Sequence, residues 1–269
     1  MNKYNALFKH SRLIISFTIC LTLLGIGLWS SASSRKQRSR PLEEIRKDLV
    51  TDQIKLDNKT QGFEILGMDK TQMGDILLSL KNNYAKRITG FQVTVGAARI
   101  QTELILGGDK NEFISPGAIY EKVYFAQEGL DEQGIVVRAV VFEDGTSDGE
   151  PDFIKEIKDY RVGMKLERER VLAKLHYILS SPQTDILADL EKLEMDTLSL
   201  TQGRRYGKLD NIALGSRNER KRILDEIKNF RRIHSKLRSH GEQENENDYR
   251  KSLAQLVEFY ENIIAIAKP

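Results

Sequence analysis

The sequence predicts an α+β protein with an N-terminal membrane helix, an antiparallel β-sandwich of about seven strands and a C-terminal region of about four helices. Three observations predict this fold class: an uncharged apolar run near the start, short alternating runs within residues 61–150, and helical periodicity over residues 151–269. The 269 residues suffice for one or two domains behind a leader. A net charge of +3 argues neither for nor against a polyanionic partner.

The leader, residues 1–32, is predicted to be a signal peptide or a membrane anchor. Its seventeen residues from Leu13 to Trp29 carry no charge, and as a helix they extend about 25 Å, at the short end of what spans a bilayer. The preceding basic residues and the small side chains up to Ala32 are typical of a cleaved secretory signal. The basic residues that follow at once, beginning with Arg35, favour an uncleaved anchor. We therefore expect an anchored chain, or a secreted one if it is cleaved after Ala32.

Residues 33–60 begin with a polar, low-complexity stretch and are predicted to form a juxtamembrane spacer. Basic residues on both flanks of the apolar run leave its orientation open. A β-sandwich behind a signal-like segment is a common exported arrangement, so an extracytoplasmic body is expected by analogy. Cys20 is the only cysteine, and a single cysteine cannot form an intrachain disulfide.

The sandwich is predicted for residues 61–150, where β-like runs alternate with turn residues at a spacing of about ten residues and no helix lies between them. The run over residues 135–142 is almost entirely apolar, so we expect this strand to be central and covered on both faces. The seven candidate strands are residues 63–66, 75–81, 88–95, 97–106, 113–114, 119–125 and 135–142.

Residues 151–269 are predicted to be helical. Apolar residues recur at spacings of four, three and four from Phe153 to Met164, and Glu167 and Arg168 interrupt this stripe before Val171 resumes it. A helix of about 28 residues is expected to end where a proline follows residue 181.

Three further helices are predicted. The second, which can begin at Pro182, carries apolar residues from Ile186 to Leu198. The third begins with a capping box at Ser216, after a mobile linker over residues 201–215. The fourth covers residues 249–263, and all four are expected to bury their apolar faces against one another.

The turn between the last strand and the first helix has the pattern of a calcium loop. Oxygen-bearing side chains at Asp144, Thr146 and Asp148, followed by Gly149, match four early positions of such a loop, and Asp152 falls at the ninth. The twelfth position, normally a bidentate Glu, is a lysine here. The alternative is an acidic turn that caps the following helix without a metal.

No catalytic motif is singled out: the sequence has no paired-cysteine or His-Glu-x-x-His metal spacing and no phosphate-binding glycine loop. The third helix is rich in basic residues, which predicts either contact with an anionic lipid or polymer, or a solvated face paired with acidic neighbours. Nucleic acid is not expected as a partner. The basic residues are Arg217, Arg220, Lys221, Arg222, Lys228, Arg231, Arg232, Lys236 and Arg238.

Two stretches carry a resemblance. Residues 78–83 (LSLKNN) with 88–93 (ITGFQV), and residues 139–149 (AVVFEDGTSDG), resemble paired strands and a final strand with an acidic turn in uncharacterised exported or membrane-anchored bacterial proteins with immunoglobulin-like modules. The resemblance covers about residues 60–165 and implies an immunoglobulin-like sandwich without the usual disulfide cysteines. It implies no activity, and the C-terminal helices match no family that we can name.

These observations predict a binding or scaffolding protein of the cell envelope. The membrane is the expected partner through the run from Leu13 to Trp29, and the helices could contact a protein partner or a second copy of the chain. The alternatives are an enzyme or enzyme accessory with a site between sandwich and helices, and a cytoplasmic-facing membrane protein whose basic helix contacts anionic lipid.

Overall fold

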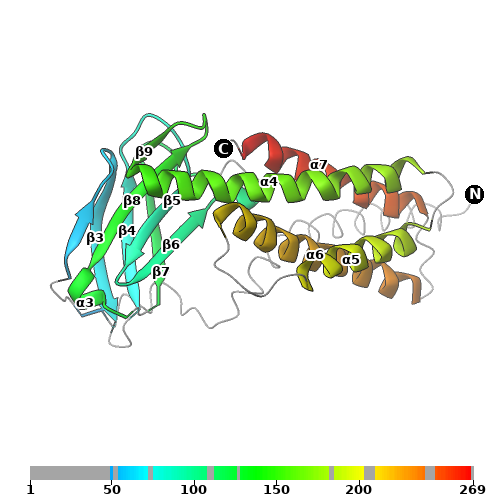
Figure 1. The fold of residues 1–269 in the computed structure, drawn as a ribbon, viewed down its shortest axis with the longest axis horizontal. Coiled ribbons are helices and arrows are strands. Elements are labelled where there is room, and N and C mark those ends of the chain that lie inside the picture. The colour runs from blue at the N-terminus through cyan, green and yellow to red at the C-terminus, as the bar shows by residue number, and fades with distance from the viewer. Residues whose placement is uncertain are drawn as a thin grey trace, which may run out of the picture. The chain divides into compact units, whose positions relative to one another are not determined.

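The computed structural model describes residues 49–50, 54–71, 75–107, 112–125, 128–181, 185–202, 210–239 and 246–267. The predicted membrane segment from Leu13 to Trp29 and the cleavage position after Ala32 lie outside the described residues. All described residues belong to one compact unit, Leu42–Pro269. This unit is α+β, with strands in two sheets followed by four helices, which confirms the predicted class (Figure 1).

The first sheet has the strand order β1-β3-β4-β7, and each neighbouring pair is antiparallel. A bulge interrupts the β3–β4 register between Ile65 and Gly67. The strands are β1 (Leu49–Val50), β3 (Phe63–Thr71), β4 (Ile76–Asn82) and β7 (Ile119–Tyr124).

The second sheet has the order β2-β8-β5-β6, and β9 also pairs with β8. The pairs between strands of residues 61–150 are antiparallel, as predicted, whereas β2, from the range predicted as a spacer, pairs with β8 in parallel. β2 is not predicted as a strand because three residues are too few to show an alternating pattern. The strands are β2 (Leu56–Asn58), β5 (Ile88–Val95), β6 (Ala98–Glu103), β8 (Ile135–Phe142) and β9 (Ser147–Gly149).

Two predicted strands are shorter or absent. The run over residues 97–106 forms β6 and then a 3₁₀ turn, η1 (Ile105–Gly107), and residues 113–114 contribute only an isolated bridge between Ile88 and Ile114. A short helix, α3 (Leu130–Gln133), precedes β8.

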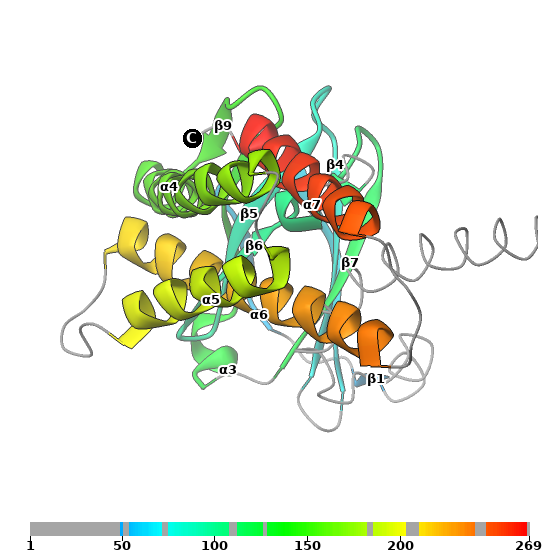
Figure 2. The ribbon, with the colours of Figure 1, turned by 90° about the vertical axis from the view of Figure 1, so that its right-hand side faces the viewer.

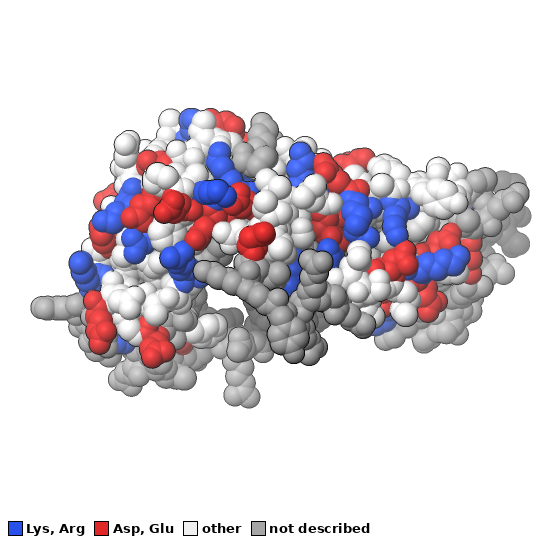
Figure 3. Space-filling view, viewed as in Figure 1, with Lys and Arg blue, Asp and Glu red and all other residues white. Residues whose placement is uncertain are grey.

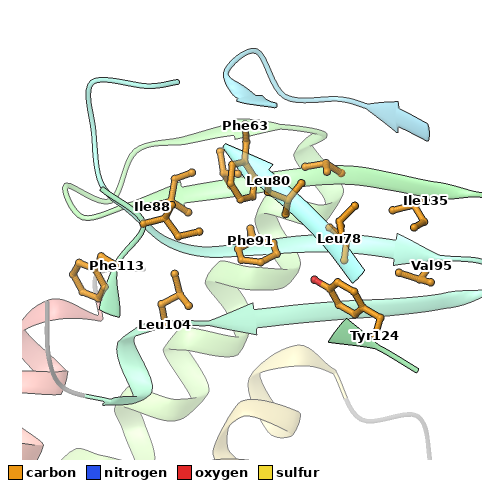
Figure 4. Close-up of a cluster of buried hydrophobic side chains, with 14 of the residues drawn as sticks. Phe63, Leu78, Leu80, Ile88, Phe91, Val95, Leu104, Phe113, Tyr124 and Ile135 are labelled. Atoms are coloured by element: carbon orange, nitrogen blue, oxygen red, sulfur yellow. The ribbon is translucent and has the colours of Figure 1, made fainter. Parts of the chain in front are cut away.

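Aromatic side chains fill the space between the sheets. The ring of Phe91 packs edge-on against Phe63 and Tyr120, with ring centroids 5.2 and 5.5 Å apart. Figure 4 shows Phe63, Leu80 and Phe91 pointing toward one another from different strands. Side chains from both sheets therefore close over a single apolar core.

β8 is covered on both faces, as predicted. Val137 and Val140 belong to the core between the sheets, whereas Ala139 and Val141 pack against Ile157 of the first long helix. A strand buried on both sides needs a continuous apolar run, which is what residues 135–142 supply.

The helices are α4 (Pro151–Ser180), α5 (Ile186–Gln202), α6 (Asn211–Ser239) and α7 (Glu246–Ile266). Figure 2 shows α4 and α7 on one side of the helical region and α5 and α6 on the other. One core joins all four, and one large apolar side chain buried there contributes roughly 1.5–3 kcal/mol.

The predicted start of the third helix is wrong. α6 begins at Asn211, where the carboxylate of Asp210 accepts the backbone N–H of Ala213 at 2.7 Å and caps the helix. Ser216 lies inside the helix, and its hydroxyl donates to the carbonyl oxygen of Gly163 at 2.9 Å. The capping-box pattern therefore does not mark a helix start here, because the hydroxyl of Ser216 donates to a carbonyl group of α4 and does not cap its own helix. Pro182 lies outside the described residues, and Asp185 caps the described start of α5 through the backbone N–H groups of residues 187 and 188.

Two glycines let α4 and α6 approach until their backbones touch. A Cβ atom on Gly163 would lie 1.9 Å from the carbonyl oxygen of Ile212, and one on Gly215 would lie 2.0 Å from that of Tyr160. These contacts exclude any side chain at either position.

The helices also complete the sandwich core. β9 ends at Gly149 and α4 begins at Pro151, so the two elements follow almost without a linker. Met164 of α4 and Ala267, just after α7, belong to the same buried cluster as Phe91. Sandwich and helices are therefore packed as parts of one body.

Candidate functional site

The predicted calcium residues are found in the turn between β8 and β9, in β9 itself and at the start of α4. The carboxylate of Asp144 accepts the backbone N–H and the hydroxyl of Thr146, and it pairs with the ammonium of Lys86 at 2.7 Å. The hydrogen bond from Lys86, followed by those from Thr146, lowers the pKa of Asp144. Asp144 and Thr146 therefore lie together in this turn.

Asp148 is engaged elsewhere. Its Oδ2 accepts the backbone N–H of Gln61 at 2.6 Å and also the hydroxyl of Tyr84. Burial, together with the hydrogen bond to Asp148, raises the pKa of Tyr84. Asp152 is exposed in the first turn of α4, where a negative charge is favourable.

Across the described ranges, no group of three or more His, Cys, Asp or Glu side chains is placed to hold one metal ion. Calcium binding stays a prediction. The contacts that the structure does show tie β9 to Gln61, just before β3, and to Tyr84, just after β4.

A buried ion pair joins the sandwich to the helices. The guanidinium of Arg161 on α4 meets the carboxylate of Glu103 on β6 through Nη2 at 2.9 Å and Nε at 3.0 Å, and the side chains are 1% and 4% exposed. Arg161 Nη2 also donates to the hydroxyl of Thr89 at 3.1 Å. Burial raises the pKa of Glu103, against the opposing effect of Arg161.

Gly90 makes room for this pair. A Cβ atom at that position would lie 2.5 Å from Nη2 of Arg161. An enzyme with a site between sandwich and helices would have that site at this junction. The charged groups of Arg161 and Glu103 bind one another there, as in a buried ion pair that joins two parts of a structure.

A second buried set of charges lies among α4, α6 and α7. Nε of Arg168 is 2.7 Å from a carboxylate oxygen of Glu219, with side chains 1% and 2% exposed. The same guanidinium lies over the ring of Tyr260, 5.6 Å from its centroid. The hydroxyl of Tyr260 donates to Glu226, which pairs with Arg222 at 3.0 Å. Burial lowers the pKa of Arg168 and raises that of Tyr260.

Glu167 is buried beside this set. Its carboxylate pairs with Arg170 at 2.5 Å and with Arg220 at 2.8 Å. Burial alone would raise the pKa of Glu167, but the hydrogen bonds and charges of the two arginines outweigh it, so the pKa is lowered.

In the sequence, Glu167 and Arg168 interrupt the apolar stripe of α4. In the structure the stripe continues through the charges: the buried positions of α4 include 157, 161, 164, 168, 171, 175 and 178, at spacings of four and three. Arg161 and Arg168 occupy two of these positions. This heptad-like spacing was the signal that could have located both buried arginines.

The basic residues of α6 fall into two groups. Arg220, Arg222 and Arg231 pair with carboxylates of α4, α6 and α5, as a solvated face with acidic neighbours predicts. On the face of the molecule in Figure 3, acidic and basic side chains are similarly interspersed. A second group stays exposed, namely Arg217, Lys221, Lys228 and Arg232. Nothing is described for the side chains of Lys236 and Arg238.

No family model, no curated protein and no solved structure matches the chain. Within the described ranges, no helix combines the length and hydropathy that crossing a bilayer requires.

Proposed function

We propose that this chain is a membrane-anchored or exported binding and scaffolding protein of the cell envelope. The observation that carries the proposal is the buried contact between the β-sandwich and the C-terminal helices. Arg161 and Glu103 form a buried ion pair there, and Met164 and Ala267 enter the sandwich core. Because the helices are packed rigidly against the sandwich, a partner bound to the sandwich would be held at a fixed position relative to the helices.

The strand pairing supports an immunoglobulin-like sandwich. Counted from β3, the first, second and fifth strands form one sheet, and the third, fourth, sixth and seventh form the other, in the order β6-β5-β8-β9. Immunoglobulin constant domains divide seven strands in a related way, with the first, second and fifth in one sheet and the third, sixth and seventh in the other, but they place the fourth strand in the first of these sheets. Such modules bind partners through their loops and strand edges, and this is the contact surface that we propose for this chain.

The helices are long enough to act as a spacer. α4 has 30 residues, which corresponds to about 45 Å of helix. Its inner face is held by α6 and α7 through Gly163, Arg168 and the apolar core. In this proposal the helices are a rigid spacer or a site of self-association, and the apolar run from Leu13 to Trp29 tethers the body to the membrane.

The proposal is tested by locating the body relative to the membrane. Full-length chain, and the same chain without residues 1–40, would be fractionated, and reporters fused after residue 40 would report which side they occupy. We expect the full chain in the membrane fraction with active extracytoplasmic reporters, and loss of membrane association without the leader. Full-length chain that is freely soluble in the cytosol with its leader intact would refute the proposal.

A further inference from the structure

α6 carries an uneven distribution of charge. Its 29 residues include nine Lys and Arg against three Asp and Glu. The acidic residues do not balance the exposed side, because Glu219 is buried against Arg168 and Glu226 is bound by Arg222 and Tyr260. The excess positive charge is therefore directed to solvent.

The exposed cations form a row. Arg217, Lys221, Lys228 and Arg232 follow at spacings of four, seven and four, which places them on one face of the helix. The row extends over about 22 Å. Asp225 is the one acidic residue exposed within it.

The row differs from the other basic residues of α6 in its contacts. Within the described part of the chain, Arg217, Lys221 and Lys228 make no ion pair, and Arg232 donates only to the side-chain oxygen of Asn229 at 2.8 Å. Four cations on one helix face, with no carboxylate partner among the described residues, attract an external anion.

We propose that this row of α6 is a docking surface for the anionic headgroups of a phospholipid bilayer. The inference rests on the proposed membrane anchor, because the run from Leu13 to Trp29 would keep the body close to the headgroups. Clusters of four or more Lys and Arg on a helix attract anionic lipid, each residue favouring contact by roughly fivefold. A single-stranded nucleic acid is less well matched, because the row offers no aromatic side chain on which a base could stack.

The experiment uses the full chain in vesicles. Cys20→Ser and Ser235→Cys would leave one thiol, at an exposed position of α6 next to Arg232. A donor dye there and an acceptor on lipid headgroups report their separation by energy transfer. Vesicles of phosphatidylcholine alone would be compared with vesicles that also contain phosphatidylglycerol. We expect stronger transfer in the anionic vesicles, falling to the neutral level as salt is added.

Two variants of equal net charge decide the role of the row. The quadruple variant Arg217→Glu, Lys221→Glu, Lys228→Glu, Arg232→Glu is expected to abolish the extra transfer. The matched control reverses four exposed lysines outside α6 and is expected to keep it: Lys55→Glu, Lys155→Glu, Lys192→Glu, Lys251→Glu. If circular dichroism shows that the first variant loses helix, glutamine replaces glutamate in both sets.

Three outcomes would overturn the inference. The first is equal transfer in neutral and anionic vesicles, and the second is an equal loss in the control variant. The third is binding of duplex DNA or RNA by the chain in neutral vesicles that the row variant abolishes, which would assign the row to nucleic acid. Flotation of the chain with both kinds of vesicle tests the anchor separately, so failure of the row and failure of the anchor are distinguishable.

Discussion

Gly163→Ala should be among the most damaging single-methyl changes in this protein. The added Cβ would lie 1.9 Å from the carbonyl oxygen of Ile212 and 2.8 Å from the backbone nitrogen of Ser216. Carbon and oxygen atoms in close contact are normally about 3.3–3.6 Å apart, so α4 and α6 must separate by more than about 1 Å.

That separation would disturb two buried contacts. The hydroxyl of Ser216 donates to the carbonyl oxygen of Gly163 at 2.9 Å, and the Arg168–Glu219 pair is 2.7 Å long. Overpacking costs about 1–3 kcal/mol and breaking a buried ion pair about 3–5, whereas Ala returns about 1 through its helix propensity. We expect Gly163→Ala to lower the free energy of unfolding by roughly 3–7 kcal/mol, a large fraction of the usual stability of a domain.

Urea unfolding followed by far-ultraviolet circular dichroism measures this change. The matched control is Gly67→Ala, because a Cβ atom there meets nothing within 4 Å, and it should change the free energy of unfolding by less than about 0.5 kcal/mol. Gly163→Ala that is as stable as the natural chain would refute the backbone contact between α4 and α6.

Three further predictions concern buried and turn charges. Arg168→Met should lower the free energy of unfolding by about 3–5 kcal/mol because it strands the carboxylate of Glu219, and adding Glu219→Leu should restore most of the loss in the same urea assay. The pKa of Glu167 is lowered from 4.5, so the stability that this carboxylate contributes is present above pH 4.5 and is lost as the pH falls; Glu167→Gln should flatten the acid side of the stability–pH curve, and an unchanged slope would contradict the assignment. Asp148→Ala should lower the melting temperature because Tyr84 loses its acceptor; a calcium-dependent rise in the natural chain that this variant lacks would establish the calcium loop, and an equal drop with and without calcium would establish a turn held only by protein contacts.

Much of the fold could be predicted because its signals are local. Alternation predicted the main strands, the apolar run over residues 135–142 predicted the doubly covered β8, and the spacing from Phe153 to Met164 predicted α4. Each of these patterns reflects burial on one face or two, which a single segment records in its own sequence.

The rest depends on partners far away in the chain. β2 is a strand because β8 pairs with it, and Ser216 bonds α4 instead of capping its own helix. Glu167 and Arg168 are buried because Arg220 and Glu219, about fifty residues later, neutralise them. A charged residue looks solvent-exposed in sequence unless the residue that compensates it is known.

The entry of Ala267 into the core between the sheets has a consequence for synthesis. β8 leaves the ribosome about 125 residues before this alanine. Until Ala267 is made, the newly formed sheets therefore leave part of their apolar core exposed to solvent. Helices made in the meantime cannot finish docking until α7 folds back. Chains stalled or clipped before α7 would therefore expose apolar surface to proteases and chaperones, which gives the cell a means to recognise incomplete copies.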